Sequence, residues 1–474
     1  MAFGSILDGP SHKALKDWIS KALPAVAKQL EDPVAEVKDT AAWTLGKICQ
    51  LHPAVVKTNL EPLLQVATSG LSMTPRVASN CCFAIHSIAQ AYEDEAQAIT
   101  TPISKFFLKL IELLLQAADR QDKGTMSLRE AAYETINALI TTGAMDTIEY
   151  SLKLVPTFMH RLLQAIQVVN AHASNPEIRE KGRQMFSHLV SALYHITCKV
   201  EEKIEPHAAD LMKLYQQVLL LSAQTNNSHE ETLIAVGAIA NTIEEKFENF
   251  IGMINDVILL ALKLVTQPTS CMYAIGCVGD FSRALGPKIT PFAKGYLQIL
   301  VADLNHDGLE PYVKPHIISC IGDIAMAIGA EFAQYMEPVG QILQVAAHIQ
   351  KPEDPDEDFL EFWDSLRLAI LDTYTSILQG LRSAEVGQLF APFAEFSVLY
   401  VEHVWQDDDR NLELTKSCIG LLGDIAQTLG PKAAQLFRRE SMKVIIETGK
   451  LSRSQEVSRL AKWAEKLMLQ ALGQ

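Results

Sequence analysis

The apolar residues of this 474-residue chain recur at intervals of three and four, which places them along one face of an α-helix. In one such stretch, Ile275, Val278, Phe281 and Leu285 fall on a single stripe. The alternation of apolar and polar residues that marks a strand is weak throughout, and no Asn-Gly turn joins two β-branched runs. The pattern therefore predicts an all-α protein.

One short motif occurs three times, as GDFSRALG at 279–286, GDIAMAIG at 322–329 and GDIAQTLG at 423–430. Its aspartates, Asp280, Asp323 and Asp424, lie 43 and then 101 residues apart, which leaves room for one degenerate copy at Asp372. A fixed period of this length is typical of stacked helical repeats. The aspartate lies roughly 150° from the centre of the apolar stripe. Each copy should therefore pack with one face and present a carboxylate on the other.

Each repeat is expected to be a pair of helices joined by a short turn, with about ten complete pairs over residues 11–474. Residues 1–10 look like the end of a truncated repeat, because Gly4 precedes Gly46 by 42 residues. The second helices after the first repeat are expected at 79–91, 128–141, 180–200, 231–247, 271–285, 313–328, 366–381, 415–429 and 456–472. Prolines expected to kink the first helices are Pro24, Pro62, Pro102, Pro156, Pro206, Pro291, Pro338 and Pro392. The acidic stretches 351–358 and 406–410 are predicted to be solvated loops.

Composition agrees with small stacked helices, since 48% of the residues are apolar and only 7% are aromatic. The formal net charge of −15 argues against binding to nucleic acid and favours a basic partner, although solubility alone would also explain it. The eight cysteines include no CxxC pair and are expected to be reduced, buried thiols of an intracellular protein. The longest apolar run noted, 257–265, is too short to span a membrane, and no signal peptide is expected.

No catalytic or cofactor-binding motif stands out. The chain lacks a phosphate-binding GxxxxGK[ST] loop, an HExxH zinc motif and a GxSxG nucleophile elbow. His188 and His195 share a helical face, but with no third ligand nearby a structural pair is favoured over a metal site. We therefore expect no enzyme activity, no cofactor and no metal.

Several segments together resemble the carboxy-terminal half of the importin beta (karyopherin beta) family of nuclear transport receptors, over essentially the whole chain and in order. They are VKDTAAWTLGKI at 37–48, PRVASN at 75–80, VGDFSRAL at 278–285, IGDIAMAIGAEF at 321–332 and LAKWA at 460–464. The resemblance implies a HEAT-repeat fold, a right-handed superhelical solenoid of α-helices.

In that family the carboxy-terminal half wraps around the basic importin-beta-binding helix of importin alpha, using acidic side chains and tryptophans on its inner surface. The positions that match here are Asp39, Trp43, Glu134, Glu231, Asp280, Asp323, Asp424 and Trp463, with Asp372 matching less closely. Phe83 stands where the family commonly has a further tryptophan, which weakens a stacking role there. One carboxylate per repeat would match a basic helix, because neighbouring helices lie about 8 to 10 Å apart. Core packing of Trp43 and helix capping by the aspartates are the competing interpretations.

The resemblance also implies partners and a location. It places a site for Phe-Gly nucleoporins and secondary Ran contacts in the middle repeats, about 206–329, and the main Ran-GTP site upstream, so Ran-GTP binding should be weak. The implied receptor is a monomer that binds neither nucleic acid nor membrane and occupies the cytoplasm, nucleus and nuclear pore complex. A HEAT-repeat scaffold for another multiprotein complex is the alternative.

Overall fold

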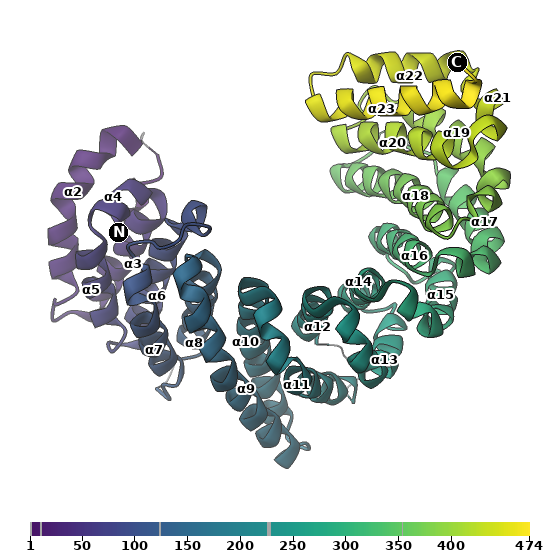
Figure 1. Ribbon diagram of the computed structural model, residues 1–474. Helices are drawn as coiled ribbons and strands as arrows, with labels where there is room; N and C mark the ends of the chain where they lie inside the picture. Colours follow the sequence, from purple (N-terminus) through teal and green to yellow (C-terminus); the bar gives the residue numbers. More distant parts are fainter. Residues whose placement is uncertain (1, 10–11, 123–124, 225–228, 353) are drawn as a thin grey trace. The chain divides into compact units, whose positions relative to one another are not determined.

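The structure is a computed structural model that describes residues 2–9, 12–122, 125–224, 229–352 and 354–474 (Figure 1). Every regular element in these ranges is a helix, so the prediction of an all-α fold is confirmed. The chain forms two compact units, residues 1–218 and 219–474, and the division falls inside α11 (Glu205–Ala223).

The first unit stacks helix pairs in chain order. After the short α1 (Ala2–Ser5), its first helices are α2 (His12–Gln29), the broken pair α4 (Pro53–Thr58) and α5 (Leu60–Gly70), α7 (Phe107–Ala118) and α9 (Ile148–Ala171). Its second helices are α3 (Ala35–Leu51), α6 (Pro75–Gln90), α8 (Thr125–Thr142) and α10 (Pro176–Val200). Each second helix packs directly on the next one, so these helices share one face of the unit.

The second unit repeats this arrangement. Its first helices are α13 (Glu248–Leu262), α15 (Thr290–Leu304), α17 (Met336–Ala347), α19 (Ala391–Trp405) and the pair α21 (Ala434–Phe437) and α22 (Glu440–Lys450). Its second helices are α12 (Glu230–Ile243), α14 (Pro268–Leu285), α16 (Lys314–Ile328), α18 (Glu357–Ser383), α20 (Leu412–Leu429) and α23 (Gln455–Leu472). Here too consecutive second helices are in contact, and in Figure 1 they line one side of the unit while the first helices line the other.

The apolar stripes form the core between the helices. The stripe residues Ile275, Val278, Phe281 and Leu285 of α14 are all at most 2% exposed. Ile318, Ile321 and Ile324 repeat this burial on α16. The spacing of apolar residues at intervals of three and four therefore predicts the packed face correctly.

The expectation that a proline kinks every first helix is wrong. Of these eight prolines, Pro24 and Pro156 lie in the interior of a helix, beyond its first turn. Pro206, Pro291 and Pro392 occupy the second position of their helices, Pro62 and Pro338 the third, and Pro102 lies in a turn before α7. Proline is tolerated in the first turn because the backbone N–H groups there have no helical acceptor. The recurring proline starts most of the first helices rather than bending them.

Positive backbone φ angles mark the ends of several second helices. Gly286, Gly329 and Gly430 have φ of 52°, 53° and 52°, a region that glycine adopts readily because it has no side chain. Glu201 and Glu244, which follow α10 and α12, adopt φ of 51° and 49° at the equivalent point. A side chain is strained in this region, so these two junctions are less favourable than the glycine ones.

The acidic stretch 351–358 is only partly a loop. Helix α18 begins nine residues before the predicted start, because the Asp356 side chain accepts a hydrogen bond from the Phe359 N–H at 2.8 Å. Glu357 and Asp358 then lie in the first turn, where negative charge is favourable. The expectation of a solvated loop is therefore wrong for 356–358, because Asp356 caps the helix that begins at Glu357.

Seven of the eight cysteines are buried and all eight are free, but Cys198 is exposed, so the expectation that all would be buried is wrong at that position. Burial raises the pKa of the Cys49 thiol to about 12, which keeps it protonated.

One stretch of the described residues, Pro311–Ala347, is long and apolar enough to cross a membrane by length and composition. In the structure it is two helices, α16 and α17, separated by a 3₁₀ segment that begins at Gly329. Half of its most apolar window is buried against the neighbouring helices. Core helices of folded proteins pass the same test, so this is weak evidence for a membrane span.

Asp303, in the last turn of α15, is a buried carboxyl group that should make the stability of the protein depend on pH. It is 7% exposed, and burial raises its pKa to about 6, opposed by His306 and Lys263. The folded state then holds a proton that the unfolded state has released, so this group makes the protein less stable as pH rises from about 4 to 6. We expect Asp303→Asn to stabilise the protein at neutral pH by at most about 3 kcal/mol and much less near pH 4.

Thermal unfolding of both proteins across this pH range measures the effect. Asp307→Asn, on the exposed loop that follows, is the matched control. An equal change in both variants, or the same stability gain for Asp303→Asn at both pH values, would contradict the prediction.

Candidate functional site

All nine residues predicted to contact a basic partner lie on second helices. They are Asp39 and Trp43 on α3, Glu134 on α8, Glu231 on α12, Asp280 on α14, Asp323 on α16, Asp372 on α18, Asp424 on α20 and Trp463 on α23. Because consecutive second helices pack on one another, each unit carries its share of these residues along one face.

Two glycines, Gly237 on α12 and Gly279 in the first motif copy, are seats for the aspartate of the next second helix. The other two motif glycines receive different residues, Thr373 at Gly322 and Trp463 at Gly423. A Cβ atom on Gly237 would lie 2.2 Å from Oδ2 of Asp280, and one on Gly279 would lie 2.7 Å from Oδ2 of Asp323. Any side chain at these glycines would displace the carboxylate. Gly279-Asp280 therefore couples α14 to both neighbouring second helices, since Gly279 receives Asp323 of α16 and Asp280 enters the seat at Gly237 of α12.

Aromatic rings occupy the same kind of seat elsewhere. A Cβ on Gly423 would lie 2.1 Å from Cζ3 of Trp463, and one on Gly4 would lie 2.4 Å from Cζ3 of Trp43. Phe83 rests in the same way on Gly46. Trp463 remains 36% exposed, so one part of the ring packs while another faces solvent. Core packing and contact with a partner, which the sequence analysis treated as alternatives for tryptophan, are compatible here.

The contacts between these glycines and the residues they receive are not predicted from the sequence. The signal was present, since each glycine precedes the bulky residue it receives by about one repeat. Spacing alone does not show which two side chains meet, because this depends on how far one helix slides along its neighbour.

The seat of Trp463 gives a direct prediction. We expect Gly423→Val to push the indole off α20 and to destabilise the α20 and α23 pair by roughly 1 to 3 kcal/mol through overpacking. Thermal unfolding measures the loss, and hydrogen exchange locates it. Gly420→Val on the same helix is the control, because a Cβ there would approach its nearest neighbour, Leu460, only to 4.0 Å. Equal destabilisation by both variants would contradict the seating.

Several of the predicted acids are already paired with a neighbouring second helix. Asp39 accepts from Asn80 at 2.8 Å and pairs with Arg76 at 2.8 Å, both on α6. Asp424 pairs with Arg382 at 2.7 Å and accepts from Gln379 at 3.2 Å, both on α18.

Asp280 and Asp323 share one cation. Arg283 lies 2.6 Å from Asp280 through Nη2 and pairs with Asp323 through Nη1. Asn241 of α12 donates a further hydrogen bond to Asp280 at 2.9 Å. Burial raises the pKa of Asp323, and the Arg283 charge and hydrogen bond oppose the rise.

Asp424 is buried, contrary to the expectation that each motif aspartate is presented on the unpacked face of its helix. Asp424 is only 5% exposed, so the prediction that the motif aspartates all point away from the packed surface is wrong for this residue. A position opposite the apolar stripe of one helix still faces another helix when second helices pack side by side. Asp424 is thus fixed in an interface between α18 and α20.

Three of the predicted acids are not balanced by an arginine or lysine. Glu134 is exposed and has no ion-pair partner among the described residues. Asp372 is exposed and accepts from the Ser417 hydroxyl at 2.8 Å, with no arginine or lysine paired to it in the described ranges. The Glu231 side chain is 41% exposed and lies 3.3 Å from Nδ1 of the buried His229. These three carboxylates are the ones that the structure leaves with charge available to a partner.

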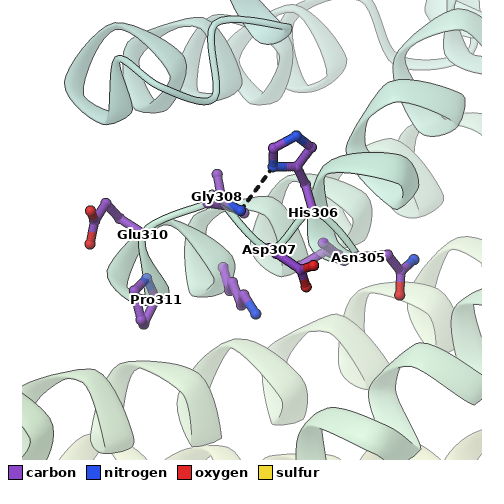
Figure 2. A pocket seen from close by; sticks show the side chains of 9 residues that line it. Asn305, His306, Asp307, Gly308, Glu310 and Pro311 are labelled. Carbon is purple, nitrogen blue, oxygen red and sulfur yellow. Dashed lines mark hydrogen bonds between the residues drawn. The ribbon is translucent and has the colours of Figure 1, made fainter.

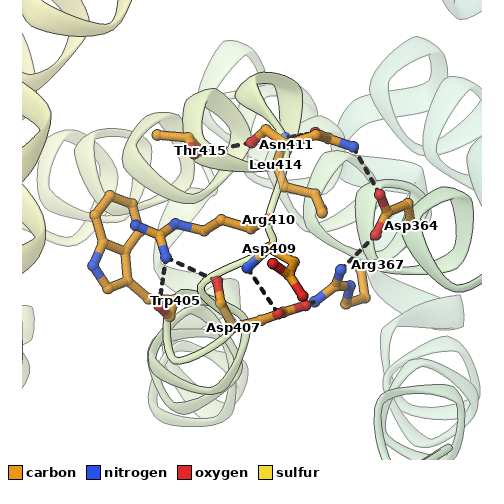
Figure 3. A network of polar contacts seen from close by, with 9 residues as sticks. All are labelled: Asp364, Arg367, Trp405, Asp407, Asp409, Arg410, Asn411, Leu414 and Thr415. Atoms are coloured by element: carbon orange, nitrogen blue, oxygen red, sulfur yellow. Dashed lines mark hydrogen bonds and ion pairs between the residues drawn. The ribbon is translucent and has the colours of Figure 1, made fainter. Parts of the chain in front are cut away.

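The acidic stretch 406–410 is anchored rather than simply solvated (Figure 3). Arg367 of α18, 3% exposed, donates to Asp407 at 2.7 Å and to Asp364 at 2.5 Å. Partial burial raises the pKa of Asp407, but hydrogen bonds from Arg367 and the Asp409 N–H outweigh this and leave it below its ordinary value. Arg410 lies 4.0 Å from the centre of the Trp405 ring and donates to the backbone carbonyl oxygens of Trp405 and Asp407.

A hollow of about 540 Å³ lies at the connection between α15 and α16, and Figure 2 shows the side chains around it. Its lining comes from one segment, residues 304–311 and Lys314. The His306 ring turns back over the loop, where its Nδ1 accepts from the Gly308 N–H at 3.0 Å. Across the described ranges, no three His, Cys, Asp or Glu side chains gather as they would around a metal ion.

Two models of known protein families match the sequence of this chain. The model described as importin subunit beta-1-like, TPR repeats, matches residues 62–450, and the HEAT repeat model matches residues 22–52. The chain belongs to the importin beta-1-like family. Both descriptions denote arrays of helix pairs, and the HEAT-repeat fold expected from the sequence is confirmed.

Individual relatives agree with this family. The chain is 31% identical to importin subunit beta-1 of Schizosaccharomyces pombe over 469 residues, which cover 98% of this chain and 54% of the relative. A crystal structure of importin beta superposes with a TM-score of 0.90 at 27% identity, over 99% of this chain and 55% of that one. A structure of Kap95p with RanGDP superposes with a TM-score of 0.79 at 25% identity, over 100% of this chain and 55% of that one. The chain spans about half the length of the importin beta proteins it matches.

Proposed function

We propose that this chain is the part of a nuclear import receptor that binds the basic importin-beta-binding helix of importin alpha along the face of its second helices. The observation that carries the proposal is the row of carboxylates on these helices, in a protein of net charge −15. Within either unit, a basic helix laid along the second helices would meet a carboxylate or an indole at most helix pairs. Family membership supports the proposal, because the matched relatives are importin beta proteins.

We expect two kinds of contact with the basic helix, ion pairs from the exposed acids and stacking on the aromatic rings. Glu134, Glu231 and Asp372 supply charge that is not already neutralised. Trp43 and Trp463, fixed on their glycine seats, present ring surface to arginine or lysine stems, worth about 0.5 to 2 kcal/mol each. Exposed ion pairs contribute only about 0.2 to 1 kcal/mol each, so affinity must come from many contacts together.

We further propose that Phe-Gly nucleoporins and Ran are partners. Kap95p, a structural relative, has been solved with RanGDP. Binding of Ran-GTP by residues 1–474 should be weak. The proposed locations are the cytoplasm, the nucleus and the nuclear pore complex, and the proposed solution state is a monomer without a cofactor.

Fluorescence anisotropy with a labelled importin-beta-binding peptide tests the central proposal. We expect saturable binding that weakens steeply as salt rises, because screening shortens to below about 10 Å. A peptide of the same composition in scrambled order is the control. No binding at low salt, or equal binding of the scrambled peptide, would favour the alternative of a HEAT-repeat scaffold for other proteins.

A further inference from the structure

The ion pairs between α14 and α16 leave a cation in the place where a partner's cation would bind. Arg283 contacts one oxygen of Asp280 and one of Asp323, so a single guanidinium bridges two successive second helices. The two carboxylate side chains are only 24% and 28% exposed, whereas the Arg283 side chain is 53% exposed. The cation therefore covers the acids and lies between them and solvent.

The position of Arg283 depends on the seat at Gly279. A Cβ on Gly279 would lie 2.7 Å from Oδ2 of Asp323 and 3.2 Å from Nη1 of Arg283. The missing side chain thus lets both charged groups rest against α14. Two carboxylates and one arginine leave one net negative charge at this junction.

Arg283 also lines two hollows. One, of about 460 Å³, is lined by Arg283 together with Asn241, Glu244 and Glu245. Glu244 is exposed and has no ion pair among the described residues, whereas Glu245 pairs with Lys288 at 3.3 Å. The second hollow, of about 680 Å³, is lined by Arg283 and Asp323 and by a largely apolar set that includes Met326 and Ile328. Arg283 therefore shares one hollow with the free carboxylate of Glu244, and Asp323 lines the other hollow.

We propose that Arg283 is an internal competitor for the partner's basic side chains. In the free protein it neutralises Asp280 and Asp323. When a partner arginine or lysine reaches these carboxylates, the Arg283 side chain swings to Glu244. The inference rests on the proposed function, and it adds a residue that lowers affinity for basic ligands and so favours those with several well-placed cations.

The physical reason is a competition between similar contacts. Displacing Arg283 loses two charge-assisted hydrogen bonds, and a partner cation restores them only if its own geometry is as good. Glu244 reduces the loss by offering the displaced guanidinium a new partner. Removing Arg283 should therefore strengthen peptide binding, even though it removes an ion pair from the protein itself.

The experiment compares Arg283→Gln with Lys288→Gln by peptide anisotropy. Both variants remove one positive charge, but Lys288 pairs with Glu245 and Glu248 and contacts neither aspartate. We expect Arg283→Gln to bind the importin-beta-binding peptide about three- to tenfold more tightly than Lys288→Gln does. Arg283→Lys, which keeps the charge but cannot bridge both acids in the same way, should fall between wild type and Arg283→Gln.

Glu244→Gln supplies a second, independent arm. It should weaken peptide binding in the wild-type background more than in the Arg283→Gln background, because the Glu244 carboxylate matters only when a displaced Arg283 can pair with it. If Arg283→Gln fails to fold, Arg283→Lys replaces it in both arms, and the expected changes keep their direction but are smaller.

The outcomes separate the two levels of the proposal. Failure of the wild-type protein to bind the peptide would refute the proposed function. Binding by wild type, with Arg283→Gln no tighter than Lys288→Gln, would overturn the competitor role and leave Arg283 as a clamp between α14 and α16.

Discussion

Charge reversal at the three unbalanced carboxylates, Glu134→Lys, Glu231→Lys and Asp372→Lys together, should nearly abolish binding of the importin-beta-binding peptide. Each reversal removes an attraction and adds a repulsion, so the three should cost about 3 to 5 kcal/mol at low salt, or more than a hundredfold in Kd. Stability should change little, because none of the three balances a buried arginine or lysine.

The control must change the net charge equally without touching the second helices. Asp256→Lys, Glu337→Lys and Glu395→Lys meet this condition, since all three residues are exposed and lie on the first helices α13, α17 and α19. Anisotropy and thermal unfolding are measured on both triple variants. If the control weakens binding as much as the test variant does, attraction to the overall charge would explain binding, and the assignment of the second-helix face would be wrong.

The same reasoning excludes Asp424 from a clean binding test. It is buried and paired with Arg382, so a lysine there would place two cations in the interface between α18 and α20. An altered affinity at Asp424 would then report a structural change rather than a lost partner contact.

Replacement of Arg367 by methionine should destabilise the α18 to α20 region by about 3 kcal/mol. Removing one partner of a buried pair costs roughly 3 to 5 kcal/mol because the remaining charges lose their counter-ion, and the partial exposure of Asp364 and Asp407 places the effect at the lower end. The loop 406–410 should also lose its anchor, since Asp407 would accept no guanidinium (Figure 3).

Thermal unfolding and hydrogen exchange measure this effect. Arg459→Met, on the exposed surface of α23, is the control for loss of one arginine. Arg367→Lys should lie between wild type and Arg367→Met, because lysine keeps the charge without the two-pronged geometry. A melting temperature of Arg367→Met equal to that of the control, with unchanged exchange in 406–414, would show that the network adds nothing to stability.

Helical periodicity in the sequence was sufficient to predict most of the fold. The second helix expected at 180–200 is α10 (Pro176–Val200), and the one expected at 415–429 is α20 (Leu412–Leu429). Errors arose where one residue type has two roles. The recurring prolines start helices instead of kinking them, and Asp356 caps α18 instead of lying in a solvated loop. Both roles depend on the position relative to the helix start, which periodicity locates only to within a turn.

The sequence by itself determined the class of fold, the repeat and the helices that carry the acids, because these follow from local spacing along one helix. Only the tertiary structure decided which acids are available. Asp372 and Asp424 belong to successive copies of the repeat, yet one is exposed and accepts from a serine while the other is buried against an arginine. Their environments are set by residues 42 to 45 positions away along the chain, on adjacent helices. Charge compensation between repeats depends on how closely those helices approach, and at Gly237 and Gly279 that approach is possible because the seat has no side chain.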